Sequence, residues 1–159
     1  MEEKSVVVKN HLGVYGFIFK DNWNSILLIK KARGPYTGLY DLPGGTIEPE
    51  ELIEETLERE IKEETNCDLI ASTQLTTVDT RFDWNREAEG KPNALFKHIG
   101  ILYLATVSGE PSTKGDGLDS NGAEWIKLSD IINNKVQVTP FIKMGLKYMN
   151  ENGKWKRKL

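Results

Sequence analysis

The chain has 159 residues, a formal net charge of −3 and a sequence pI of about 5.5. Its hydrophobic fraction of 38% and charged fraction of 28% suit a globular protein with a real core. Because there is no overall basic field, the composition argues against a nucleic-acid polymer as a partner, whereas a small anionic substrate bridged by metal remains compatible.

The single cysteine rules out an intramolecular disulfide, and the charged residues 1–5 followed by three valines match neither a signal peptide nor a membrane span. A cytoplasmic location is therefore expected, with no membrane as a partner. No internal repeat or low-complexity linker interrupts the sequence, so one domain over residues 1–159 is expected.

In chain order, apolar runs bounded by turn residues predict strands over residues 12–19, 26–29, 74–83, 99–107 and 124–128. Glycine, proline and polar clusters predict loops over residues 31–41, 85–93 and 109–122. An acidic helix is expected over residues 49–65, and Thr139-Pro140 is expected to begin the last helix. Strands outnumber the few, separated helices, which predicts an α+β fold with a mixed sheet between helices.

Several carboxylates of the acidic helix are expected to lie on or beside its apolar face and not on its solvated face. At about 100° per residue, its apolar stripe consists of Ile53, Leu57 and Ile61. Glu64 falls inside this stripe, Glu60 lies at its edge and Glu63 flanks them. Three carboxylates at this spacing repel one another, and partial burial adds to the cost. A hard divalent cation satisfies such oxygens best, and Mg²⁺ is the usual choice when a phosphate completes the shell.

The residues around this helix follow a longer pattern. Gly45 is followed after five residues by Glu51, then after seven residues by Arg59-Glu60-Ile61 and, one residue on, by Glu63-Glu64. This resembles the Nudix box, Gly-x5-Glu-x7-Arg-Glu-U-x-Glu-Glu-x-Gly-U with U a bulky aliphatic residue, over residues 45–67. Two positions depart from the pattern, Asn66 for glycine and Cys67 for an aliphatic residue. Asparagine tolerates the left-handed conformation that ends helices, and neither position is a candidate ligand.

The resemblance to the Nudix (MutT-type) family implies an α/β/α sandwich in which the box forms a loop–helix–loop. It also implies a hydrolase of phosphorus-containing acid anhydrides, which cleaves the diphosphate linkage between a nucleoside diphosphate and another moiety. Mg²⁺ would be the cofactor, with Mn²⁺ as a substitute. The implied metal ligands are Glu60, Glu63, Glu64 and the carbonyl of Gly45. Glu51 and Arg59 would orient the ligating glutamates.

The general base stays open between Glu63 in the box and two acids near the long loop, Asp119 and Glu124. Candidate substrate contacts are aromatic side chains that could stack on a base and arginines that could hold phosphate or ribose. They are Tyr36, Tyr40, Phe82, Trp84, Arg33 and Arg81. The two histidines, His11 and His98, lack companions at metal-ligand spacing and are expected to be structural.

Two other classes compete with the enzyme. One is a Nudix-fold module that binds a nucleotide without cleaving it, against which the full set of box acids argues. The other is an acidic helix that serves only as a solvated interaction surface, against which the inward position of Glu64 argues. The expected partner is a small nucleoside diphosphate derivative, and a homodimer stays open.

Overall fold

The structure is a computed structural model that describes residues 6–115 and 120–154. Within these residues the strands are β1 (Val7–Lys20), β2 (Ser25–Lys31), β3 (Tyr40–Asp41), β4 (Gly44–Thr46), β5 (Asp68–Trp84), β6 (Ala94–Ser108) and β7 (Ser120–Lys127). The helices are α1 (Ile53–Thr65), α2 (Leu128–Ile132) and α3 (Pro140–Glu151), with a short 3-10 turn η1 at Glu87–Glu89. None of the helices in the described part of the chain is long and apolar enough to cross a membrane.

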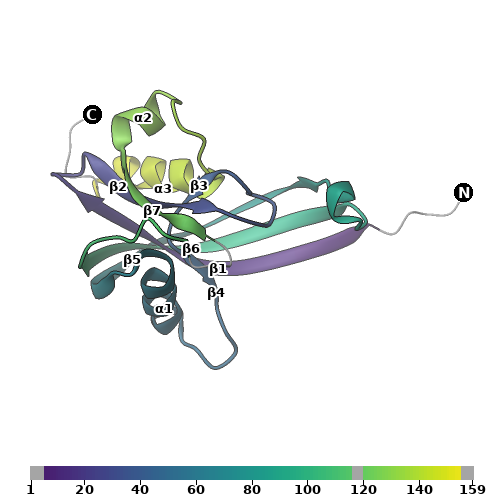
Figure 1. Cartoon of the computed structure of the whole chain (residues 1–159), viewed down its shortest axis with the longest axis horizontal. Helices are drawn as coiled ribbons and strands as arrows, with labels where there is room; N and C mark the ends of the chain where they lie inside the picture. Colours follow the sequence, from purple (N-terminus) through teal and green to yellow (C-terminus); the bar gives the residue numbers. More distant parts are fainter. Residues whose placement is uncertain (1–5, 116–119, 155–159) are drawn as a thin grey trace, which may run out of the picture.

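The strands form one mixed sheet in the order β3-β2-β1-β6-β5, with β4 paired to β1 and β7 paired to β2 (Figure 1). β1 and β6 are parallel, whereas the other pairs are antiparallel. β1 divides its free edge between two partners, because residues 13–15 pair with β4 and residues 19–20 pair with β2. This division brings the glycines of β4 against the middle of β1.

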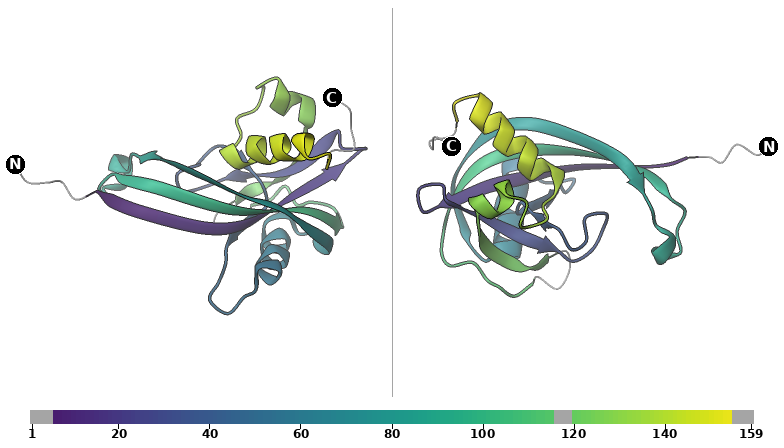
Figure 2. Two further views of the ribbon diagram at one scale, coloured as in Figure 1. Left: turned by 180° about the vertical axis from the view of Figure 1, so that it is seen from behind. Right: turned by 90° about the horizontal axis from the view of Figure 1, so that it is seen from above.

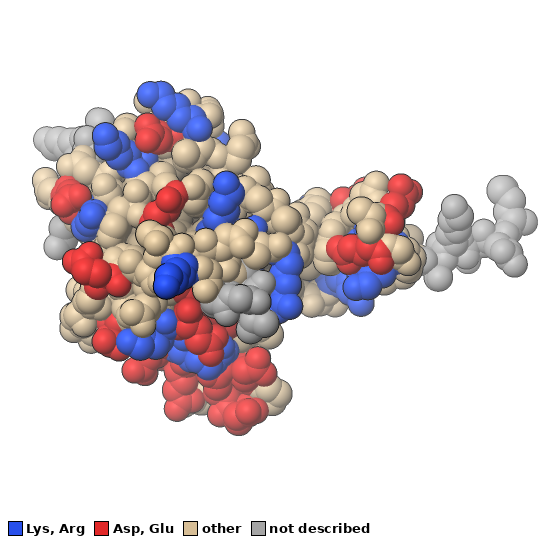
Figure 3. All heavy atoms as spheres, viewed as in Figure 1, with Lys and Arg blue, Asp and Glu red and all other residues tan. Residues whose placement is uncertain are grey.

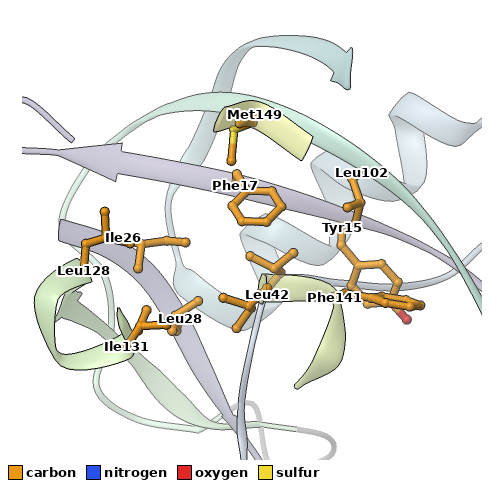
Figure 4. Close-up of a cluster of buried hydrophobic side chains, with 11 residues drawn as sticks. Tyr15, Phe17, Ile26, Leu28, Leu42, Leu102, Leu128, Ile131, Phe141 and Met149 are labelled. Carbon is orange, nitrogen blue, oxygen red and sulfur yellow. The ribbon is translucent and has the colours of Figure 1, made fainter. Parts of the chain in front are cut away.

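Helices cover both faces of the sheet (Figure 2). On one face, Leu57 and Ile61 of α1 pack against Val14 and Ile18 of β1, and all four are fully or almost fully buried. On the other face, side chains of α2 and α3 form a second apolar cluster with strand residues (Figure 4). Its members include Phe17, Leu28, Leu102, Leu128, Phe141 and Met149. The expected α+β sandwich with a mixed sheet is confirmed.

Three strands continue past the helices as a three-stranded extension, formed by residues 7–12, 79–84 and 94–99 (Figure 1). Alternation along β6 places Phe96, His98 and Gly100 on the face shared with α3. Gly100 is needed there, because a Cβ at this position would collide with the ring of Phe141. Beyond Phe141 the same face is left to a different set of side chains, described below.

Several predicted boundaries were wrong. α1 begins at Ile53 and not at residue 49, because residues 48–51 form a turn in which the Glu51 N–H donates to the Glu48 carbonyl at 3.0 Å. The N–H of Leu52 donates to Glu55 Oε2 at 2.7 Å and caps the helix. The expected loop at 109–122 overlaps β7, and the sequence interpretation missed β3, β4 and α2 as well as the full length of β1, β5 and β6.

The other end of α1 agrees with expectation. Asn66 ends the helix in the left-handed conformation, with φ 63° and ψ 11°, and its N–H donates to the Lys62 carbonyl. Cys67 is fully buried beside the α1 core, as a small hydrophobe would be. Both departures from the box pattern are therefore structurally accommodated.

Candidate active site

Glu64 is a buried carboxylate aimed at the glycine turn. It is 2% exposed, and its Oε1 accepts a hydrogen bond from the Gly44 N–H at 2.8 Å. Its Oε2 is buried without a hydrogen-bond partner. Burial raises the pKa of Glu64 well above its usual range, and the charge of Glu60 raises it further. An unsatisfied carboxylate oxygen in this setting calls for a cation.

The turn itself is shaped for close approach. A Cβ at Gly44 would collide with the backbone of Val14 and Tyr15, so β4 lies on β1 as only glycine allows. A Cβ at Gly45 would stand 2.5 Å from Glu60 Oε1. The Gly45 backbone and the Glu60 carboxylate therefore lie against each other, next to Glu64.

Arg59 links the remaining box acids. Its Nε and Nη2 donate to the two carboxylate oxygens of Glu51 at 2.8 and 2.9 Å, in a bidentate pair. Its Nη1 donates to Glu60 Oε1 at 3.0 Å and to Glu63 Oε2 at 3.1 Å. The Arg59 guanidinium lowers the pKa of Glu51. The guanidinium thus holds two candidate ligands from one side and is itself held by Glu51.

These residues fit a hard divalent cation. The donor set is entirely oxygen, and it includes the orphaned oxygen of Glu64 and the Gly45 backbone. Among the residues described, no three histidine, cysteine or acidic side chains lie close enough together to hold a metal ion. The carboxylates of Glu60 and Glu63 instead accept hydrogen bonds from Arg59. Exposed acids gather around this region, over α1 and the loop before it (Figure 3).

A pocket of about 540 Å³ opens from this end of the molecule. Gly44, Gly45 and Glu60 line one part of it, and Lys31 and Arg33 line another. The volume falls in the range of small-molecule sites. Glu60, a candidate metal ligand, therefore shares one pocket with two cations that could hold phosphate, which is the combination that a bridged metal–diphosphate ligand needs.

The rest of the pocket is aromatic. Tyr36 from the loop between β2 and β3 lines the cavity together with Trp84 and Phe96 of the three-stranded extension. Phe96 lies at the centre of this group, with ring centroids 6.2 Å from Tyr36 and 5.6 Å from Trp84, both edge-on. Phe82 stands behind Tyr36 at 5.6 Å and supports it without lining the pocket.

The structure brings together only some of the expected residues. Arg33, Tyr36 and Trp84 line the pocket with Gly45 and Glu60 of the box, whereas Arg81 is exposed on the opposite face of the extension from its neighbour Phe82. Tyr40 donates a hydrogen bond to Glu124, and neither lines the pocket. That hydrogen bond is the largest cause that raises the pKa of Tyr40, to about 12. Asp119 lies outside the described residues.

The sequence interpretation missed other lining residues, among them Lys31, Tyr15, Phe96, His11 and His98. The histidines were set aside because they lack metal-ligand spacing, yet both face the cavity. The histidine and Phe96 on this strand could have been found in the sequence if β6 had been predicted to begin at its true start. With the strand begun at residue 94 instead of 99, period-two alternation places Phe96 and His98 on the face of Gly100. His11 and Tyr15 share a face of β1 in the same way.

Comparisons with known proteins agree with this geometry. An ADP-ribose pyrophosphatase of Methanocaldococcus jannaschii is 34% identical over 120 residues, which is 76% of this chain and 63% of that protein. The chain thus spans less than two thirds of this relative's length. A nucleoside triphosphatase NudI of Escherichia coli O1:K1 / APEC is 30% identical over 121 residues, covering 74% of this chain and 83% of that protein.

Among solved structures, a MutT NUDIX hydrolase from Burkholderia pseudomallei aligns with a TM-score of 0.67 at 29% identity, over 88% of this chain and 98% of that one. The NUDIX domain family matches residues 9–143, which include α1, the pocket lining and all the described strands except the first two residues of β1. With the box acids, the glycine turn and the sandwich in place, the chain belongs to the NUDIX family of hydrolases, whose members generally use a divalent metal.

Proposed function

We propose that this protein hydrolyses the diphosphate linkage of a nucleoside diphosphate joined to another moiety, with Mg²⁺ as cofactor and Mn²⁺ as a substitute. The observation that carries the proposal is the orphaned Oε2 of Glu64, a carboxylate that is buried against Gly44, one of the residues that line the pocket with Gly45 and Glu60. A buried carboxylate without a partner is costly, and a metal–diphosphate ligand would relieve that cost.

Glu60, Glu63, Glu64 and the Gly45 carbonyl would hold the metal. When bound, the cation supplies neutralisation of phosphate charge and a lowered pKa for an attacking water. Glu51 and Arg59 would position the ligands, since Arg59 contacts Glu51, Glu60 and Glu63 at once. Removing this guanidinium would free the carboxylates to repel one another.

Glu63 is the favoured general base. Its side chain is 52% exposed, so it can reach a water at the mouth of the site and exchange the proton with solvent. Glu124 is the weaker candidate, because its carboxylate accepts a hydrogen bond from Tyr40 and lies outside the pocket lining. Asp119 remains a candidate on sequence grounds alone.

On the substrate side, Lys31 and Arg33 would contact phosphate or ribose, and Tyr36 and Trp84 would contact the base. The placement of Arg81 and Tyr40 away from the pocket weakens their candidacy. The two named relatives act on different nucleotides, ADP-ribose and nucleoside triphosphates, so the substrate class stays at nucleoside diphosphate derivatives. One domain over residues 1–159, a cytoplasmic location and no nucleic-acid polymer or membrane as partner complete the proposal, with a homodimer open.

The test is chromatographic detection of the products from a panel with Mg²⁺ or Mn²⁺, from neutral to alkaline pH, because ADP-ribose and sugar nucleotides yield two phosphomonoesters and no free phosphate or pyrophosphate. The panel holds nucleoside triphosphates, oxidised nucleotides, ADP-ribose, sugar nucleotides and dinucleoside polyphosphates. At least one compound should be cut, and cutting should stop in chelator. If the whole panel stays uncut while nucleotides bind, the alternative of a binding module without catalysis replaces the enzyme.

A further inference from the structure

Four side chains form a hydrogen-bonded row along the pocket wall. Tyr36 Oη lies 3.0 Å from His98 Nδ1, and Tyr15 Oη lies 2.7 Å from His98 Nε2 and 3.3 Å from His11 Nε2. His98 is 3% exposed and stands at the centre, with Phe141 against its ring at a centroid distance of 4.3 Å. Both of its nitrogens are therefore engaged by tyrosines.

The hydrogens in this row can be counted. Burial lowers the pKa of His98 to about 3, so the imidazole is neutral and carries one N–H. Burial also raises the pKa of Tyr15 and Tyr36, so both keep their phenolic hydrogens. Two hydrogen bonds to His98 need two hydrogens, of which the imidazole supplies one. One tyrosine therefore donates to His98 and the other accepts from it, and a side chain without both functions cannot satisfy the pair.

The row joins two parts of the site. Tyr36 belongs to the loop of residues 32–39, which also carries Arg33, and its side chain is the part of that loop buried against the extension. Tyr15 packs on Gly44 so closely that a Cβ there would collide with it. His98 thus fixes the loop relative to the glycine turn that Glu64 binds.

The aromatic part of the pocket lining is suited to stacking. Phe96 and Trp84 from the sheet and Tyr36 from the loop form it, with the Tyr36 ring held edge-on to Phe96. Flat heteroaromatic rings stack on such side chains whatever their identity, and the loop has to stay in place for Tyr36 to contribute.

We propose that His98 is a positioning residue, which clamps Tyr36 and the loop of residues 32–39 against the three-stranded extension and so forms a subsite for the nucleobase of the ligand. The proposal rests on the proposed function in taking a nucleotide as the ligand. It assigns His98 no contact with the reacting atoms. It predicts that the imidazole matters more for base binding than for binding of the sugar phosphate, because Lys31 in β2 lies outside the clamped loop.

The experiment is isothermal calorimetry in chelator, with AMP, GMP, CMP and UMP compared with ribose 5-phosphate. None of these probes has a diphosphate linkage, so neither metal nor turnover enters the measurement. At least one nucleotide should bind wild type about tenfold or more tighter than ribose 5-phosphate, and the tightest is used with the variants. His98→Phe should reduce this advantage about tenfold, whereas the Kd of ribose 5-phosphate should rise by only about threefold or less, since Arg33 is released with the loop but Lys31 stays in place.

Two further variants separate positioning from general damage. His98→Gln keeps an amide donor and acceptor and should restore most of the advantage, whereas Tyr36→Phe removes one hydroxyl and should reduce it with the fold intact. Lys97→Gln, on the exposed face of the same strand, is the matched control and should behave as wild type. Equal losses for nucleotide and ribose 5-phosphate, or wild-type binding that ignores the base, would overturn the proposal. A negative hydrolysis panel with intact base selectivity would overturn only the proposed function.

Discussion

The Gly44 N–H and Glu64 Oε1 form a hydrogen bond of 2.8 Å that connects residues 20 apart in the sequence. This bond fixes the direction of the buried carboxylate and leaves Oε2 as its unsatisfied end. Gly44 can lie so close to β1 only because it has no Cβ, since a Cβ there would collide with the Val14 carbonyl. The glycine turn and the acidic helix are therefore two halves of one site.

Glu63→Gln and Glu64→Gln should each lower kcat by roughly 10² or more, because each removes a charge that positions metal or water. Glu58 is exposed on the far side of α1, so Glu58→Gln should change kcat little. The measurement is steady-state kinetics with Mg²⁺ on the best substrate of the panel. Similar small effects at all three positions would show that the face of α1 is wrongly assigned.

Gly45→Ala should lower kcat about tenfold or more while the protein stays folded. The new Cβ would stand 2.5 Å from Glu60 Oε1 and push this carboxylate away, and Gly45 has no positive φ that an alanine would strain. Circular dichroism checks that the variant is folded, and kinetics on the same preparation measure its kcat. Gly44→Ala is the contrast, because its Cβ would meet backbone, so loss of stability should accompany its loss of activity. A fully active Gly45→Ala enzyme would remove Glu60 from the ligand set.

Asn66→Gly should leave activity intact and change the free energy of unfolding by less than about 1 kcal/mol, since both residues adopt the left-handed conformation at φ 63°. Asn66→Val should be clearly less stable, because a β-branched side chain resists positive φ. Urea unfolding of the three proteins decides the matter. An Asn66→Val protein as stable as wild type would mean that the backbone relaxes at this cap at no cost.

The sequence predicted the candidate site best for residues that lie close together in the chain. The positions of Glu60, Glu63 and Glu64 follow from helical geometry alone, and the buried Glu64 confirms the face assignment. The helix start was missed because Glu51, expected in the first turn, instead binds Arg59 with its side chain while its backbone closes a turn. Tertiary contacts of this kind carry no periodic signal.

Long-range pairing explains the rest. β3 and β4 have two and three residues, too few for any pattern, and exist because β2 and β1 offer them edges. Phe96 and His98 become neighbours of Tyr36 only through the fold, 60 or more residues apart. Isolated histidines in a sequence are usually structural, and here the structural contacts of His98 lie in the pocket wall itself.

The free energy of unfolding of wild type should decrease at mildly acidic pH because of His98. Its pKa is about 3 folded against 6.5 in an unfolded chain, with burial as the main cause and the nearby His11 and Lys31 adding to it. Below pH 6.5 the unfolded state binds a proton that the folded state does not, so stability is lost as pH falls from 6.5 toward 3.

The expected slope from this one group approaches about 1.4 kcal/mol per pH unit below its unfolded pKa. His98→Gln lacks the group, so the difference in unfolding free energy between wild type and variant should shrink steadily from pH 7 to pH 5. Urea titrations at each pH measure it, with Lys97→Gln as the control. Parallel pH dependence in wild type and His98→Gln would show that folding does not lower the pKa of His98.

The melting temperature of wild type should depend on metal much more strongly than that of Glu64→Gln. Without metal, wild type bears a buried, unpartnered carboxylate oxygen and the charge of Glu60 beside it. Glutamine at position 64 removes the buried acid that faces Glu60, and it can still accept from the Gly44 N–H, so Glu64→Gln should melt at or above the wild-type temperature in chelator.

Excess Mg²⁺ should then stabilise wild type by RT ln(1 + [L]/Kd), about 2.7 kcal/mol at a hundredfold excess over Kd, and Glu64→Gln by much less. Melting curves of both proteins, in chelator and in Mg²⁺, give four temperatures that test the idea together. Glu58→Gln should keep the full Mg²⁺ shift, because its side chain lies on the exposed face of α1. If Glu64→Gln melts lower in chelator yet keeps the full shift, Glu64 is a structural residue, and its inward orientation then says nothing about metal.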